Sequence, residues 1–281
     1  MSAMDPRVLA AMSANGGLIT HARALDLGLS PGEVRRLVRN GAWVVVRRGV
    51  YTSREHWESL DEWRGRPRLI ARAVVLTMRR GWVLSHTSAA DELGLATLRP
   101  PVPLTHITRP GWTNAWTENQ VAHHLARFSP SQVVEINGVR VLNAARAAVD
   151  IARRYGDMHG IVACDSARRA GVTKAELVEA YTPMQQWPGV RAVYTSVDLS
   201  DPRAENPHES LGRHLTIEAG LGEPDCQFPI RTAEGIKWCD LRGGNQSSRP
   251  TARSSTSRSP AEGWPTGPLR RWSGRRRSVS A

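Results

Sequence analysis

Among the side chains of the first fifty residues, the arginines give the clearest indication of a chemical function. Two groups lie close together in the sequence, Arg35, Arg36 and Arg39, followed by Arg47 and Arg48. A guanidinium group stays charged at physiological pH and can donate paired hydrogen bonds to a phosphate or to O6 and N7 of guanine. These five arginines are therefore candidate contacts to double-stranded DNA.

The elements that must position these arginines are predicted by local signals. Asp5 and Pro6 have the residue types that begin a helix, and Thr20 can cap a second one. Ser30 and Glu33 have the S-x-x-E spacing of a capping box, which predicts the start of a third helix. Three short helices are thus expected before residue 42.

The third helix and the residues after it complete a recognisable pattern. Val34, Leu37 and Val38 share the buried side of the helix, so its arginines fall elsewhere on the surface. After Gly41, the runs WVVV and GVYT predict two strands joined by a tight turn at residues 47–49. This order is typical of a winged helix-turn-helix, whose third helix enters the major groove while the wing contacts the backbone. The alternative is a small helical domain with merely solvated arginines.

The stretch GGLITHARALDLGLSPGEVRRLVRNGAWVVVRRGVYTS also resembles a known family. It is similar to the N-terminal domain of AbiEi-type antitoxins of type IV toxin–antitoxin systems, which is common at the head of GC-rich actinobacterial proteins. The resemblance covers about residues 5–53 and is most specific from the third helix to the wing. It implies DNA binding, often autoregulatory, through these elements. A cognate toxin is a candidate protein partner, although the resemblance alone does not imply one.

Length and composition limit the other function classes. The 281 residues allow roughly two domains with their own cores. The sequence has no apolar run long enough to span a bilayer and no signal-peptide pattern, so we expect a cytoplasmic protein without a membrane partner. Its three cysteines match neither a zinc pattern nor a disulfide framework, and we expect them to be reduced.

The net charge of +12 is mainly a property of the C-terminal tail. Residues 242–281 contain nine arginines and only one acidic residue, Glu262. The whole chain has 36 arginines against two lysines, a ratio that indicates GC-rich codons rather than selection for contacts to DNA. The high charge therefore adds little support to a nucleic-acid function.

The middle of the chain predicts a mixed α/β domain with few chemical signals. Asn137-Gly138 predicts a hairpin, and successive helices are expected over residues 143–184. His123 and His124 are adjacent, so both could not face one metal from a helix, and Ser85-His86 lacks the G-x-S-x-G pattern of a nucleophile. We expect no catalytic site there. The segments SHTSAADELGL and VRVLNAARAAVDIARR resemble the central region of the same actinobacterial proteins.

A different chemistry is indicated near the C-terminal end, in DPRAENPHESLGRHLTIEAGLGEPDCQFPIRTAEGIKWCDLR. A helix with Glu209 and Arg213 is expected before two strands, the second of which has Asp240 near its end. This order resembles the start of the PD-(D/E)xK nuclease core, in the version related to very-short-patch-repair endonucleases. The resemblance implies Asp240 as a magnesium ligand and Glu209 as the helix acid beside it. The alternative for Glu209 is a surface ion pair with Arg213.

The next strand of that nuclease core is missing from the sequence. An apolar strand with an E-x-D-G set should follow Asp240, but the chain continues GGNQSSRPTARSSTS. Two carboxylates are too few for a magnesium site of this type, so we expect a truncated, inactive core with no cofactor. Its apolar face and unpaired edge should be exposed, which predicts local instability over residues 203–242.

Three interpretations of the tail, residues 243–281, remain open. It could be a basic arm that binds nucleic acid, an inert disordered tail, or the product of a reading-frame slip near Gly243. The third is favoured, because GC-rich codons for residues 246–279 read in a shifted frame give IVEADGEVKY and then an acidic helix. That string contains the absent E-x-D-G set and a lysine. Magnesium binding is expected only if this strand is restored.

These observations together predict an α+β protein in four parts. Residues 1–60 form the winged helix-turn-helix, 61–200 the mixed α/β domain, 201–242 the truncated nuclease-like core, and 243–281 the disordered basic tail. The leading hypothesis is a DNA-binding transcriptional regulator or AbiEi-like antitoxin. The first alternative is a magnesium-dependent endonuclease targeted by its head, and the second is an interaction module whose middle domain holds a toxin.

Overall fold

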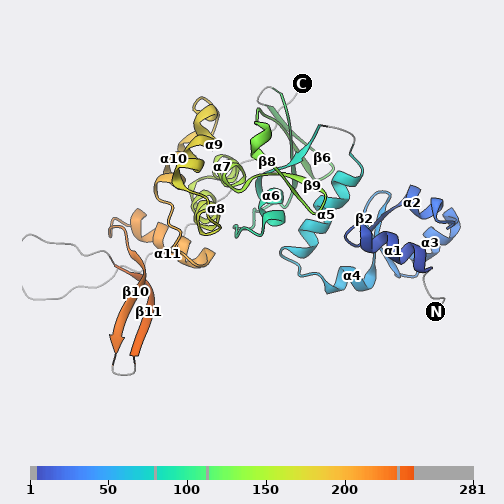
Figure 1. Cartoon of the computed structure of the whole chain (residues 1–281), viewed down its shortest axis with the longest axis horizontal. Helices are drawn as coiled ribbons and strands as arrows, with labels where there is room; N and C mark the ends of the chain where they lie inside the picture. Colours follow the sequence, from blue (N-terminus) through green and yellow to red (C-terminus); the bar gives the residue numbers. More distant parts are fainter. Residues whose placement is uncertain (1–4, 79–80, 112–113, 233–234, 244–281) are drawn as a thin grey trace, which may run out of the picture. The chain divides into compact units, whose positions relative to one another are not determined.

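The computed structural model describes residues 5–78, 81–111, 114–232 and 235–243, and its mixture of helices and strands is α+β as expected (Figure 1). The described residues all belong to one compact unit. The expected boundaries near residues 60 and 200 stay predictions. The tail and its frame-slip interpretation lie outside the described residues, apart from the first residue of the tail.

The head has the element order of a winged helix-turn-helix. Its elements are α1 (Pro6–Ala14), β1 (Leu18–Thr20), α2 (His21–Asp26), α3 (Pro31–Arg39), β2 (Trp43–Arg47) and β3 (Val50–Ser53). The three strands form an antiparallel sheet in the order β1-β3-β2. The three helices and the two-stranded wing are therefore confirmed as elements, whereas β1 is an addition that the sequence did not predict.

The core of the head is built around Trp43, which is 1% exposed. Val8, Ala24 and Val34 bring the three helices onto this side chain. The Tyr51 ring lies 5.5 Å from the Trp43 ring between their centroids. Because β2 supplies Trp43 and β3 supplies Tyr51, the wing strands and the helices share one core.

Two helices follow the wing, α4 (Arg54–Ser59) and α5 (Gly65–Leu76). The α5 helix is tied to the following helix, α6 (His86–Leu93), by Glu92, whose side chain is fully buried and accepts from Arg72 at 2.8 Å. Arg68 contacts the same carboxylate at 3.2 Å. Such a buried carboxylate needs paired cations to be tolerated, which fixes the position of α5.

A six-stranded mixed sheet forms the middle of the chain, in the order β6-β7-β5-β4-β9-β8. Its elements, with helix α6 included, are β4 (Val83–Leu84), α6 (His86–Leu93), β5 (Thr105–Arg109), β6 (Asn114–Glu118), β7 (Val121–Leu125), β8 (Val133–Ile136) and β9 (Val139–Leu142). The predicted hairpin is confirmed, since Ile136 pairs with Val139 across Asn137 and Gly138. Both turn residues have positive φ, the conformation that the Asn-Gly pair favours.

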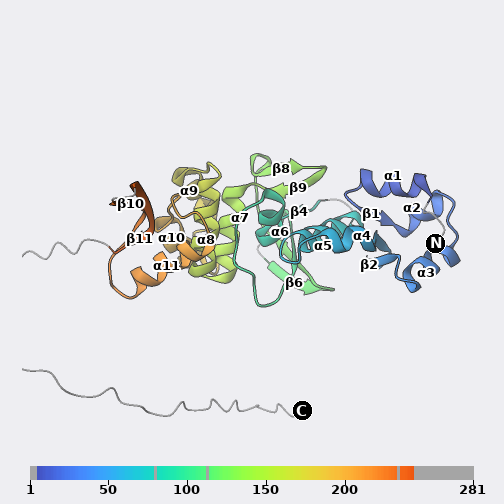
Figure 2. The same ribbon diagram turned by 90° about the horizontal axis from the view of Figure 1, so that it is seen from below.

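A group of helices continues the chain after the sheet (Figure 2). They are α7 (Ala144–Tyr155), α8 (Asp157–Arg169), α9 (Lys174–Tyr181), α10 (Val190–Asp198) and α11 (Pro207–Glu218), with a short 3-10 turn at Thr182–Met184. Another 3-10 turn, Pro130–Gln132, lies earlier in the chain, between β7 and β8. Small side chains, including Ala148, Ala152 and Ala163, allow α7 and α8 to pack closely. No helix in the described ranges has the length and apolarity needed to cross a membrane.

The alternative given for Glu209, a surface ion pair with Arg213, is wrong. Both side chains are buried rather than exposed, and Arg213 pairs instead with Asp165 on α8. The helix prediction itself is confirmed, because Asn206 caps α11 through its side chain and Pro207 is the first helical residue.

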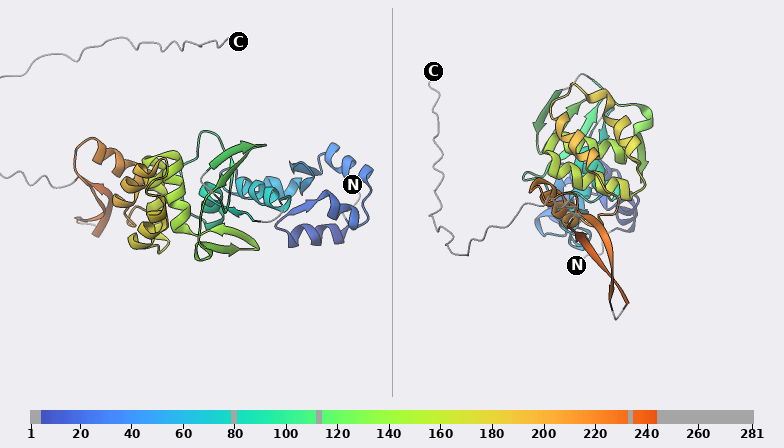
Figure 3. Two further views of the ribbon diagram at one scale, coloured as in Figure 1. Left: turned by 90° about the horizontal axis from the view of Figure 1, so that it is seen from above. Right: turned by 90° about the vertical axis from the view of Figure 1, so that its left-hand side faces the viewer.

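The last described elements are β10 (Asp225–Thr232) and β11 (Gly235–Arg242), which form a two-stranded antiparallel sheet (Figure 3). Within the described part of the chain, no third strand joins them. Ile230, Ile236 and Trp238 are 45%, 60% and 62% exposed. The expected exposure of apolar side chains and of an unpaired edge is thus confirmed for the described residues.

Candidate nucleic-acid interface

The N-terminus of α3 is fixed by a complete capping box. The Glu33 backbone N–H donates to Ser30 Oγ at 3.2 Å, and the Ser30 backbone N–H donates to Glu33 Oε2 at 2.8 Å. These bonds, with the Ser30 backbone bond as the largest cause, lower the pKa of Glu33. The sole acidic side chain of α3 is thereby committed to the helix end, so it leaves the rest of the helix surface basic.

The three arginines of α3 are exposed, whereas Val34 on the opposite side is buried. Arg35 donates from Nε to the Pro31 carbonyl at 3.2 Å. The Arg39 side chain makes no hydrogen bond or ion pair with any other described residue. The predicted candidates on this helix thus share one solvated surface from which they can reach an anionic ligand.

A two-residue turn joins the two strands of the wing. Arg47 pairs with Val50, so Arg48 and Gly49 form the turn, where Gly49 adopts a positive φ of 76°. The His21 backbone N–H donates to the Gly49 carbonyl at 2.8 Å, which ties the turn to the start of α2. Arg48 is exposed and unpaired among the described side chains, at a position fixed by its neighbours.

Arg47 and Arg48 have different surroundings, although the sequence predicts the same role for both. It is only half-exposed, and its Nη1 donates to the Asn119 carbonyl, in the turn between β6 and β7, at 3.4 Å. Both arginines line a cavity of about 470 Å³ together with Thr105 and Gln120. Arg48 is therefore the wing arginine that is free to bind a phosphate, whereas Arg47 has a partner within the chain.

The candidate nuclease residues have different environments. Glu209 is 7% exposed, and its Oε2 accepts from the Glu205 backbone at 2.8 Å and from Gln227 at 3.3 Å. Asn206 donates to its Oε1. Asp240 lies exposed on β11. Neither carboxylate belongs to a cluster of three metal-ligating groups in the described residues, and their roles stay predictions.

The histidines of the middle domain are arranged in a way that the sequence did not predict. His123 and His124 lie on a strand, not a helix, and His124 is buried with His86 and His106. Ser85 and His86 also lie side by side, with Oγ and Nδ1 2.9 Å apart. If VAHHL is taken as a strand, its alternating side chains place His123 and His124 on opposite faces of the sheet.

Comparison with known proteins shows that the head is similar to a known family. Residues 7–54 match the family model for the transcriptional regulator AbiEi antitoxin. This segment is AbiEi-like. It contains α3 and the wing, and therefore all five candidate arginines, so the resemblance to these antitoxins is supported for the head. The nuclease-like resemblance of the C-terminal end is not supported in this way.

Two relatives extend the similarity beyond the head. They are the uncharacterized proteins MT2308 and Rv2248 from two strains of Mycobacterium tuberculosis, CDC 1551 / Oshkosh and H37Rv. Each is 26% identical over 204 residues, which cover 72% of this chain and 69% of the relative. The crystal structure of the RV2827C protein from Mycobacterium tuberculosis is similar over 81% of this chain and 88% of that one, at 16% identity and a TM-score of 0.44.

Proposed function

We propose that this chain is a DNA-binding transcriptional regulator of the AbiEi antitoxin type, which contacts double-stranded DNA through α3 and the wing. In this proposal the arginines of α3 reach base edges and phosphates in the major groove, and Arg48 contacts the backbone beside it. A cognate toxin remains a candidate protein partner.

The observation that carries the proposal is the coincidence of the family match with the exposed arginines. The matched segment, residues 7–54, is the one that presents Arg35, Arg36 and Arg39 on a capped helix. The single acidic group of that helix is held at its N-terminus by the cap, whereas Arg36 and Arg39 lie in the last turn. A cluster of exposed arginines on a helix that can enter the major groove favours a polyanion as ligand.

Binding of the full chain to DNA tests the proposal. The probe is a duplex from directly upstream of the chain's own gene, and its competitor is a shuffled duplex of equal composition, each titrated at several salt concentrations. We expect preference for the upstream duplex and a steep fall in affinity with salt. The double variant Arg36→Ala/Arg39→Ala should bind at least about tenfold more weakly, because each lost contact costs about 1–3 kcal/mol.

A matched control separates specific contacts from net charge. Arg191 on α10 and Arg231 on β10 are also exposed, so Arg191→Ala/Arg231→Ala removes the same charge at a distance in sequence from the head. This variant should keep nearly the affinity of the original chain. Equal losses in the two double variants would contradict a site on α3.

The endonuclease alternative is tested separately. Glu209 is occupied by local hydrogen bonds and Asp240 is exposed, so no described geometry favours this alternative. We expect incubation of supercoiled plasmid with the chain and magnesium to give no cleavage above that of Asp240→Asn. Cleavage that requires magnesium and is lost in Asp240→Asn would establish the alternative.

A further inference from the structure

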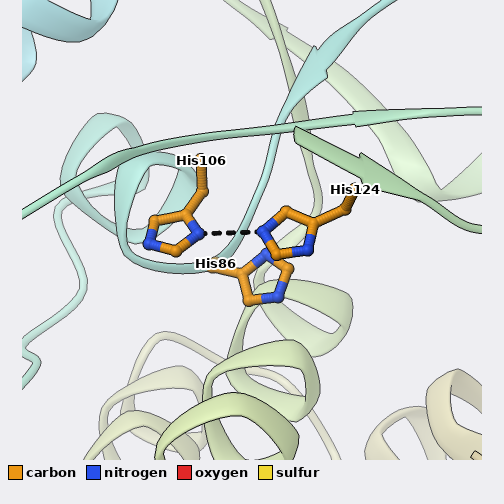
Figure 4. Close-up of side chains that lie close together, drawn as sticks. All are labelled: His86, His106 and His124. Carbon is orange, nitrogen blue, oxygen red and sulfur yellow. Dashed lines mark hydrogen bonds between the residues drawn. The ribbon is translucent and has the colours of Figure 1, made fainter. Parts of the chain in front are cut away.

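Three buried histidines from three different elements meet in the middle domain (Figure 4). His86 is the first residue of α6, His106 lies on β5 and His124 lies on β7. They are 1%, 0% and 5% exposed. One ring nitrogen of each lies within 4.8 Å of the other two, and His106 Nδ1 is 3.0 Å from His124 Nε2.

Hydroxyl groups orient two of the imidazoles. Tyr155 Oη lies 2.7 Å from His106 Nε2, which leaves Nδ1 of His106 directed toward His124. Ser85 Oγ accepts from Thr108 Oγ1 at 2.8 Å and lies 2.9 Å from His86 Nδ1. An oxygen partner on one ring nitrogen is the arrangement that orients histidines whose other nitrogen binds a metal.

The cluster has two energetically unfavourable features that an apolar core would avoid. His86 Nε2 is buried and has no hydrogen-bond partner among the described atoms, which is unfavourable for a polar group. The backbone of His86 has a φ of +50°, an unfavourable conformation for a residue with a side chain. An unpartnered nitrogen and a strained backbone at one residue indicate a ligand that the cluster accepts.

Burial disfavours the charged form of all three imidazoles. It is the largest cause that lowers the pKa of His106 to about 3 and that of His124 to about 4, and it also lowers the pKa of His86. The neutral imidazole is the form that binds a metal, because one of its ring nitrogens has a lone pair.

We propose that His86, His106 and His124 form a binding site for a divalent transition metal ion such as zinc. Imidazole nitrogens are preferred ligands of zinc, and tetrahedral zinc with bonds of about 2.0 Å places them about 3.3 Å apart. His106 Nδ1 and His124 Nε2 are already 3.0 Å apart, and a ring nitrogen of His86 lies within 4.8 Å of a nitrogen of each of them. The metal joins β5, β7 and the start of α6.

Charges around the cluster both oppose and favour a cation. Arg146 and Arg153 act electrostatically on His86, and Arg154 acts on His106, which disfavours added positive charge. Asp150 acts on His124 in the opposite sense. Its Oδ2 pairs with Arg146 at 3.0 Å, and its Oδ1 lies 3.7 Å from Nη2 of Arg153. Asp150 thus offsets part of the positive charge that these arginines place near the cluster.

The experiment measures metal content and stability of the full chain. The metal-free chain is prepared with a chelator, incubated with zinc or cobalt(II), and passed through gel filtration before metal analysis. We expect one metal ion per chain and an increase in the unfolding midpoint of about 5 °C or more with zinc. His86→Gln and His124→Gln should each bind zinc at least tenfold more weakly.

Two controls make the assignment specific. His123→Gln changes the neighbour of His124 on the same strand, where the ring stacks on Trp116 instead. His214→Gln removes a second group of possible ligands, formed with Asp157 and Glu218. Both variants should keep the metal. A chain that retains neither zinc nor cobalt, or that loses the metal only through His214→Gln, overturns the proposal.

A measurement on the unaltered chain covers the case in which the buried variants fail to fold. Bound cobalt(II) is paramagnetic, so it should shift the ring signals of His86, His106 and His124 in NMR spectra and leave those of His208 unchanged. Shifts confined to other histidines would overturn the proposal. This site does not depend on DNA binding, so the two proposals can fail independently.

Discussion

Arg213 on α11 forms a buried ion pair with Asp165 on α8, in which Nη2 lies 3.0 Å from both carboxylate oxygens. Both side chains are fully buried. Asp165 Oδ1 also accepts from the Asp201 backbone at 2.7 Å, and Arg213 donates to the Leu199 carbonyl. The pair therefore holds the segment between α10 and α11 as well as the two helices.

Breaking this pair should strongly destabilise the chain. Arg213→Met leaves the Asp165 carboxylate buried without its cation, which typically costs about 3–5 kcal/mol. Urea unfolding measures this difference. The control is Asp198→Asn, which breaks an exposed pair with Lys174 and should cost less than about 1 kcal/mol. Equal effects in the two variants would contradict the importance of burial.

The capping box of α3 should contribute measurably to the stability of the head. Ser30→Ala removes the acceptor of the Glu33 backbone N–H, and a lost cap of this kind costs about 1 kcal/mol. Thermal unfolding of the full chain, followed by the loss of helical circular dichroism, is the measurement. Ser13→Ala on α1 is the control, because Ser13 is exposed and makes no side-chain hydrogen bond with the described residues. A Ser30→Ala chain as stable as Ser13→Ala would argue against the cap.

Asp91 should make the stability of the chain depend on pH. Burial raises its pKa to about 7, with Arg64 and Arg68 opposing this effect and Glu92 and Asp61 adding to it. The folded chain therefore binds a proton that the unfolded chain releases near pH 4. The stabilising contribution is fully present below about pH 4 and is lost as the pH rises to about 7.

The substitution Asp91→Asn should remove that dependence. We expect the free energy of unfolding to rise by on the order of 1 kcal/mol or more at pH 8, and to change less at pH 5. Urea unfolding at both values is the measurement. Asp26→Asn, at an exposed position on α2, should leave the pH profile unaltered. A flat profile in the original chain would show that Asp91 is not perturbed.

Arg48 should contribute one phosphate contact to DNA binding, in keeping with the proposed function. The Arg48→Ala variant should lower the slope of log affinity against log salt by about 0.9, equally for the upstream and shuffled duplexes. Arg47→Ala should change the slope less, because Arg47 already donates to Asn119. A larger effect of Arg47→Ala would reverse the roles of the two arginines.

Local signals predicted those elements whose residues lie close together in the sequence. Ser30 and Glu33 predicted the start of α3, and Asn137-Gly138 predicted the turn between β8 and β9, because both depend on bonds between neighbours. The strand β1 has only three residues, which is too short for a periodic pattern.

Contacts between distant residues were not predictable in the same way. Arg213 and Asp165 are 48 positions apart, and only the packing of α11 on α8 brings them together. The three histidines meet because strand pairing places His106 and His124 beside the start of α6. The arginines of α3 were found because a helix surface can be derived from spacing alone.

The two-residue turn of the wing has an entropic consequence for recognition. A long, mobile wing would lose conformational freedom when it settles on a phosphate, at about 1–2 kcal/mol for each backbone residue that becomes ordered. Here the Arg47–Val50 pair and the bond from His21 to Gly49 already hold the turn in place. The chain therefore loses this backbone freedom during folding, so under the proposed function only the side-chain rotamers of Arg48 would still become ordered on contact with DNA.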